Sequence, residues 1–103
     1  MKYGVIIPIT VEVLWHMFGK QPRPWSFNIE ELVERLKPEI FEQLEIEYDF
    51  NCPIYIDGFM DLTKDILMIR LASFFPYNGL YQVAEGQEYP WTSLRFNNSK
   101  NAQ

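Results

Sequence analysis

An amphipathic helix predicted over residues 28–44 constrains the fold of this chain more than any other feature. Its apolar side chains recur at helical spacing and form one continuous stripe. Asn28 is a suitable N-cap, and Glu31 stands three residues later to complete a capping box. Pro38 lies inside the stretch, which predicts a kink or a restart of the helix there. The residues of the stripe are Ile29, Leu32, Val33, Leu36, Ile40, Phe41 and Leu44.

Alternation of period two predicts the strands. Residues 3–15 are rich in β-branched side chains and have one fully apolar face. Pro8 cannot donate to a ladder, so this strand is expected to lie at a sheet edge there or to carry a bulge. Residues 45–51 alternate strictly and predict a strand that faces water on one side. Shorter strands are predicted over residues 54–57, 80–84 and 91–96.

Residues 61–75 contain the run ILMIRLASFF, which fits either a buried strand or a helix. A helix is preferred, because Leu62, Ile66, Ile69 and Ser73 would share one side of it. The order of elements predicts an α+β two-layer sandwich, with one or two helices packed on one face of an antiparallel sheet. A ferredoxin-like variant is compatible with this order, although a proline in a central first strand argues against it. We expect one domain over residues 1–96 and a polar C-terminal tail over residues 97–103.

Negative charge is concentrated in one part of the chain. Residues 27–50 hold eight acidic residues against two basic ones, a net charge of -6, while residues 1–26 sum to +2. An acidic helix and strand surface would complement a basic protein partner, since complementary charge speeds encounter. The alternative is an ordinary solvated face. Direct nucleic-acid binding is disfavoured, because only nine Lys and Arg are scattered over the chain. The predicted partner-binding residues are Glu30, Glu34, Glu42, Glu45, Glu47 and Asp49.

Residues 16–25 contain Gly19, Pro22 and Pro24 and predict a loop with aromatic and basic side chains. Trp and Arg are enriched in binding hot spots, so the loop is a second candidate contact surface. Its positive charge would meet the acidic surface of a second copy, which predicts a homodimer. The alternative is that the two tryptophans plug the ends of a small core. The candidate dimer or partner residues are Trp15, Phe18, Lys20, Arg23 and Trp25.

No catalytic motif accompanies these surfaces, so an enzyme is the weaker interpretation and no catalytic residue is predicted. The alternative function is a small-molecule-binding or catalytic domain with an aromatic-lined pocket between sheet and helices. Its polar lining would come from His16, Tyr48 and Asp57. One His and one Cys do not supply the ligands of a protein-only zinc site, and there is no Gly-rich phosphate loop. We therefore expect no metal and no cofactor.

Cys52 is the only cysteine, so no intramolecular disulfide can form, and a reducing cytoplasm is the expected location. No apolar stretch approaches the roughly 18 residues that cross a bilayer, and no signal peptide is indicated. The predicted function is that of a small cytoplasmic protein-interaction module that binds another macromolecule through its acidic helix and strand surface. Inhibitor and immunity proteins of bacterial or mobile-element genomes are the analogy.

Overall fold

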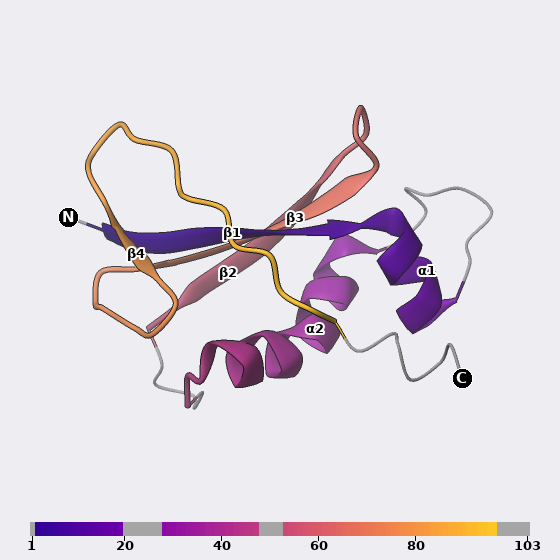
Figure 1. The fold of residues 1–103 in the computed structure, drawn as a ribbon, viewed down its shortest axis with the longest axis horizontal. Coiled ribbons are helices and arrows are strands. Elements are labelled where there is room, and N and C mark those ends of the chain that lie inside the picture. The colour runs from indigo at the N-terminus through magenta and orange to yellow at the C-terminus, as the bar shows by residue number, and fades with distance from the viewer. Residues whose placement is uncertain (1, 20–27, 48–52, 97–103) are drawn as a thin grey trace.

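The computed structural model describes residues 2–19, 28–47 and 53–96 (Figure 1). Four strands form an antiparallel sheet in the order β2-β3-β1-β4. Two helices pack against this sheet, which confirms the predicted α+β class. The elements are β1 (Lys2–Thr10), α1 (Val11–Phe18), α2 (Ile29–Leu44), β2 (Tyr55–Asp61), β3 (Ile66–Ser73) and β4 (Tyr81–Val83).

The connections follow a split β-α-β plan. Strands β1 and β2 both run antiparallel to β3, which lies between them, so they are parallel to each other and the helices cross over between them. Strand β4 flanks β1 on its other side. This is the strand order of a ferredoxin-like arrangement. In that arrangement a helix also links the third and fourth strands, whereas residues 74–80 make the link here without one.

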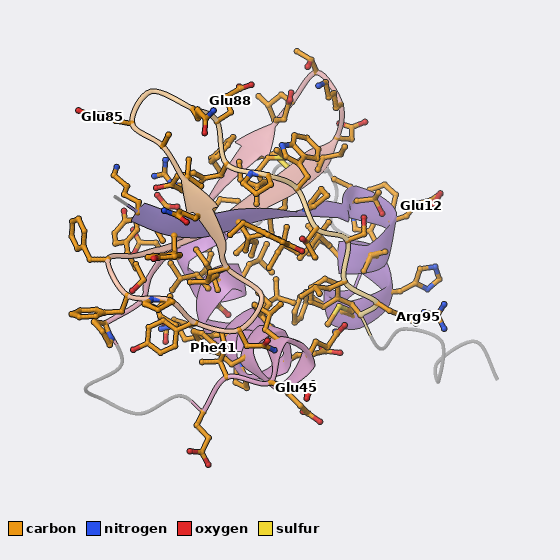
Figure 2. The ribbon with its side chains drawn as sticks, turned by 60° about the vertical axis from the view of Figure 1, so that its left-hand side comes forward. Glu12, Phe41, Glu45, Glu85, Glu88 and Arg95 are labelled. Carbon is orange, nitrogen blue, oxygen red and sulfur yellow. The ribbon has the colours of Figure 1, made fainter. Side chains whose placement is uncertain are left out.

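The core lies between the sheet and α2. Side chains at alternate positions of β1 and β3 point toward the helix stripe and are at most 2% exposed: Val5, Ile7, Ile9, Leu67, Ile69 and Leu71. From α2, Leu36 and Ile40 are fully buried and Phe41 is 3% exposed; Phe41 is labelled in Figure 2. The hydrophobic stripe read from the sequence is therefore the face that α2 presents to the sheet.

The first strand is shorter than predicted, because a helix begins where alternation still continued. Thr10 has extended backbone, and its Oγ1 accepts a hydrogen bond from the Val13 N–H at 3.4 Å, so it caps α1. Residues 11 and 14 are then the buried positions of the helix. The strand predicted for residues 11–15 and the loop predicted for residues 16–18 are both wrong, since α1 spans them.

Pro8 lies in an interior strand, yet on one side of β1 no strand pairs with the backbone at this position. Ile6 donates to the Pro90 carbonyl at 2.8 Å and accepts from the Thr92 N–H at 2.9 Å. Residues two apart on a strand direct their backbone groups to the same side, so position 8 faces that side as well. Strand β4 pairs only with residues 2–4 of β1. The missing N–H of Pro8 therefore breaks no bond of the described ladder, which agrees with the edge prediction for this position.

Helix α2 is continuous from Ile29 through Pro38 to Leu44, so it does not restart at the proline. Glu45 ends it in the left-handed conformation, with φ 59° and its N–H bonded to the Glu42 carbonyl at 3.1 Å. Residues 45–47 consequently form no strand, and that prediction is wrong. Residues 48–51 lie outside the described residues.

The helix preferred for residues 61–75 is also wrong. Strand β2 continues through Gly58 to Asp61, a tight turn follows, and β3 occupies residues 66–73. Asp61 Oδ1 accepts from the Thr63 N–H at 3.0 Å and from the Thr63 hydroxyl at 2.6 Å, and Asp65 closes the turn with φ 53°. Met68 is buried as well as its neighbours Leu67 and Ile69, so this part of β3 shows no simple alternation, which explains the ambiguous pattern.

The C-terminal part crosses from the sheet to the helix layer. The strand predicted over residues 80–84 corresponds to β4. The strand predicted over residues 91–96 is wrong, because only Trp91 forms a bridge, to Ile6. The chain then passes β1 and descends to α2 (Figure 1), where Phe96 is 5% exposed within the core. Neither helix of the described ranges has the length and apolarity needed to cross a membrane.

Candidate functional site

The outward side of α2 carries the acidic surface, which we define as Glu30, Glu34, Glu42, Glu45 and Glu47. All five are exposed. Because the apolar stripe of α2 faces the sheet, the first three point away from the core. The helical rise of about 1.5 Å per residue puts Glu30 and Glu42 about 18 Å apart along the axis. The sixth predicted residue, Asp49, lies outside the described residues.

Within the described residues, the strand half of the predicted surface forms no strand over residues 45–47. Glu45 is the C-terminal cap of α2, and Glu47 follows it without regular structure. The acidic surface is therefore one helix face with the segment after it. In Figure 2, Glu45 lies at the end of α2, well away from Glu85 and Glu88 on the loop after β4.

Two basic residues of α2 are engaged beside the acidic surface. The Arg35 guanidinium lies 4.3 Å from the centroid of the Phe18 ring, in a cation-π contact that joins α2 to α1. Lys37 Nζ lies 2.9 Å from Glu34 Oε2. Exposed pairs of this kind contribute little stability and neutralise only one carboxylate. The surface thus keeps its negative charge.

A hollow of about 370 Å³ lies where α2 meets β2. It is lined by Ile29, Glu30, Val33, Glu34, Ile56, Asp57 and Gly58. Helix and strand approach closely at the glycine: a Cβ built on Gly58 would lie 2.9 Å from Val33 Cγ2 and 3.3 Å from Ile29 Cγ2. Two carboxylates of the acidic surface, those of Glu30 and Glu34, thereby lie beside the backbone of β2.

Strand β2 is the edge of the sheet, and its backbone groups can be assigned to sides. The backbone N–H and C=O of Ile6 point away from β3, so those of the odd-numbered residues of β1 point toward β3. In the register of β1 with β3, the odd-numbered residues of β3 then bond to β1 and the even-numbered ones point toward β2. The even-numbered residues of β3 pair with Asp57 and the other odd-numbered residues of β2, so the backbone groups of these residues point toward β3. The N–H and C=O groups of Ile56, Gly58 and Met60 point outward, two of them along the hollow.

Asp57 is engaged on the outer face of the sheet, which we define as the face opposite the helices. Its carboxylate accepts from Arg70 through Nε at 3.2 Å and Nη2 at 2.7 Å, and the Tyr55 hydroxyl donates to it at 3.2 Å. Hydrogen bonding to Asp57 raises the pKa of Arg70 above its usual value. The pair is partly exposed, with side-chain accessibilities of 41% for Arg70 and 30% for Asp57.

His16, one residue of the predicted pocket between the layers, is exposed in the last turn of α1. The hollow that Asp57 lines between α2 and β2 does not include it. Tyr48 lies outside the described residues. Arg70, Tyr55 and the edge glycine Gly58 were missed from the sequence, because only the register of the hairpin brings them into relation with Asp57 and α2.

Only the first part of the candidate loop lies within the described residues. Trp15 and Phe18 are half-buried on α1. Lys20, Arg23 and Trp25 lie outside the described residues. Across the described ranges, no three His, Cys, Asp or Glu side chains stand close enough together to hold a metal ion.

Comparison with known proteins adds no relative. No family model, curated protein or solved structure matches the chain.

Proposed function

We propose that the chain is a small protein-interaction module that binds an extended basic segment of another protein along β2 and the acidic surface. The observation that supports this is the hollow in which Glu30 and Glu34 lie beside the outward backbone of Ile56 and Gly58. An exposed edge strand offers unpaired N–H and C=O groups to an added strand. The carboxylates would select lysine and arginine side chains on that strand.

The two contributions have different roles. Backbone bonds to the edge strand supply affinity with little dependence on sequence, whereas the carboxylates supply charge selectivity and faster encounter. Two copies pairing through β2 would place Glu30 and Glu34 near the same residues of the partner, and like charges oppose that arrangement. The edge therefore favours a basic partner over a second copy. A cytoplasmic inhibitor or immunity-type protein would use such a surface, and the single Cys52 agrees with that compartment.

Titration with a short peptide of alternating Lys and Val, followed by amide NMR, tests the proposal. We expect shifts at Gly58 and Met60 that weaken as salt is raised, because a Debye length of about 8 Å at physiological ionic strength screens exposed charges. Glu30→Gln with Glu34→Gln should weaken binding. The matched control is Glu85→Gln with Glu88→Gln on the loop after β4 (Figure 2), which removes the same charge elsewhere.

A second variant separates strand addition from charge attraction. Met60→Pro removes one outward N–H and leaves the carboxylates in place, and proline is tolerated at edge positions. Weaker binding by a variant that melts as the wild type does would support pairing at the edge. The proposal would be contradicted if the Glu85 and Glu88 variant lost as much affinity for the peptide as the Glu30 and Glu34 variant. It would also be contradicted if neither the Glu30 and Glu34 variant nor Met60→Pro changed the affinity.

We also propose a homodimer, supported by the charge difference between residues 1–26 and 27–50. Its contact would bring Trp15 and the segment after α1 of one copy to Glu45 and Glu47 of the other. Sedimentation of the wild type and Trp25→Ala tests it, with Phe74→Ala, a 77% exposed residue, as the control. A monomer at micromolar concentration would remove this second proposal and leave the first one standing.

A further inference from the structure

A second hollow, of about 300 Å³, lies on the outer face of the sheet. Core residues of β3 alternate with Arg70 and Ala72, which therefore point away from the helices. Ala72 forms the floor. Tyr55, Phe74 and Tyr89 supply aromatic walls, and Lys2 and Arg70 supply positive charge. Pro53 and Ser73 complete the lining.

The small side chain of Ala72 leaves this space open, and Gly4 allows Tyr89 to lie beside it. Gly4 of β1 lies opposite Ala72 in the register of the sheet. A Cβ built on Gly4 would lie 2.9 Å from Tyr89 Cε2 and 2.9 Å from the Leu71 carbonyl oxygen, so the Tyr89 ring lies directly against the strand backbone. A larger side chain at Ala72 would fill the hollow, and one at Gly4 would displace the Tyr89 wall. The walls are well exposed at two places, 58% for Tyr55 and 77% for Phe74.

The charge in the hollow is positive although the whole chain carries a net charge of -5. Arg70 uses Nε and Nη2 to hold Asp57, and a guanidinium has five N–H donors. The Arg70 side chain is 41% exposed and lines the hollow, so donors other than these two can serve a bound anion. Lys2 adds a second cation in the same lining. The Asp57 carboxylate competes for the guanidinium and also accepts from the hydroxyl of Tyr55, one of the walls.

We propose that this hollow binds a small aromatic anion, a flat ring that carries one carboxylate or phosphate group. The ring would stack between Tyr55, Phe74 and Tyr89 above Ala72. The anionic group would lie between Arg70 and Lys2. This site goes beyond the proposed function, because it lies on the outer face and shares neither the acidic surface nor the outward edge of β2.

Size and chemistry both fit such a ligand. A volume of about 300 Å³ is at the lower end of ligand pockets, which suits a single substituted ring. Aromatic walls favour offset or edge contacts with a flat ring. The planar fork of arginine matches carboxylate and phosphate oxygens, and charge-assisted bonds of this kind are among the stronger ones.

Benzoate and phenyl phosphate are the probes, with benzyl alcohol as the neutral control. Titrations followed by NMR should shift the Ala72 methyl and the Arg70 Nε–H signals with both anions. Benzyl alcohol should bind about tenfold more weakly or not at all, since it lacks the charge-assisted bond. Stronger binding of one anion assigns the carboxylate or the phosphate as the preferred group.

Three variants test the geometry. Ala72→Leu fills the floor and should abolish binding, while Lys2→Met should weaken it. Asp57→Asn has the opposite expectation, since it removes a competing carboxylate from Arg70 and should make benzoate bind more tightly. If the pair of Asp57 and Arg70 served only to hold the structure together, Asp57→Asn would weaken benzoate binding. Lys64→Met, in the turn after β2, is the matched control for loss of one positive charge and should bind as the wild type does.

The proposal is overturned by any of three results. The first is that neither anion shifts the signals of the hollow. The second is that benzyl alcohol binds as tightly as benzoate. The third is that Asp57→Asn weakens benzoate binding although its melting shows that the chain is folded. The peptide titration with the Glu30 and Glu34 variants reads a different surface, so either proposal can fail without the other.

Discussion

The side chain of Gln43 binds the backbone of Arg95 through both of its amide atoms. Nε2 donates to the Arg95 carbonyl at 2.7 Å, and Oε1 accepts from the Arg95 N–H at 3.0 Å. A glutamine on α2 thus makes the two bonds that a neighbouring strand would otherwise make. Phe96 lies next in the chain and is buried in the core. The contact holds the C-terminal segment against the helix layer.

Gln43→Ala should release this segment. Arg95 is exposed, so water can replace the lost partner, and we expect the free energy of unfolding to fall by about 0.5–1.5 kcal/mol for each bond. Hydrogen exchange should speed up at residues 94–96 before it does in β1. Gln43→Glu is the control, because it keeps the acceptor for the Arg95 N–H and loses the donor, so its effect should be smaller. Unchanged exchange at Arg95 in the alanine variant would contradict this role.

Local signals predicted the helix over residues 28–44 well, since its N-cap and apolar stripe lie within one stretch of sequence. The Glu31 N–H donates to Asn28 Oδ1 at 3.2 Å, which confirms the predicted cap. The link between Gln43 and Arg95 spans 52 positions, and no local period reports it. For the same reason the sequence showed the carboxylates of α2 but not the edge of β2 beside them. That relation depends on the pairing of β2 with β3.

Gly4→Ala should destabilise the fold and disturb the hollow above Ala72. The new methyl group would lie 2.9 Å from the Leu71 carbonyl oxygen, which belongs to the backbone and cannot move aside, and 2.9 Å from the Tyr89 ring. Overpacking of this kind costs about 1–3 kcal/mol. Urea unfolding measures the loss, and the Tyr89 ring signals should shift.

Gly86→Ala is the comparison for Gly4→Ala, because it adds a methyl group where nothing is crowded and only the backbone conformation opposes it. Gly86 has φ 84° and nothing within 4 Å of a built Cβ, so its cost comes from the left-handed conformation alone, about 1 kcal/mol. Tyr89 should keep its signals in that variant. If Gly4→Ala were as stable as the wild type, the close packing of Tyr89 on β1 would be refuted.

Thr10→Val should weaken the start of α1 while favouring the strand before it. The valine cannot accept from the Val13 N–H, and loss of a capping residue costs about 1 kcal/mol. Thr10→Ser retains the acceptor and should be close to the wild type in urea unfolding. Equal stability of the valine and serine variants would show that the strand ends at Thr10 for another reason. This position matters because alternation alone predicted a strand through residue 15, whereas α1 begins directly after the Thr10 cap.

The contribution of Asp61 to stability should disappear in acid. Its pKa is lowered chiefly by the hydrogen bond from the Thr63 hydroxyl, and Lys64 adds a weaker electrostatic effect. A carboxylate with a depressed pKa stabilises the folded state above its unfolded pKa, about 4, and loses this effect as the pH falls through the folded value. The difference in urea midpoint between wild type and Asp61→Ala should therefore be constant near neutral pH and shrink below about pH 4.

Measuring the Asp61→Ala difference in a chain that also carries Thr63→Val tests whether the Thr63 hydroxyl causes the lowered pKa of Asp61. Thr63→Val removes the hydroxyl donor and keeps the backbone N–H that also bonds Asp61. In that background the dependence of the Asp61→Ala difference on pH should flatten, because the largest cause of the pKa shift is gone. A difference that stays constant down to pH 2 in the wild-type background would mean that the ionised carboxylate does not stabilise the turn. The turn would then depend on the left-handed backbone of Asp65 and on the bond from the Val11 N–H to the Asp65 carbonyl at 3.1 Å.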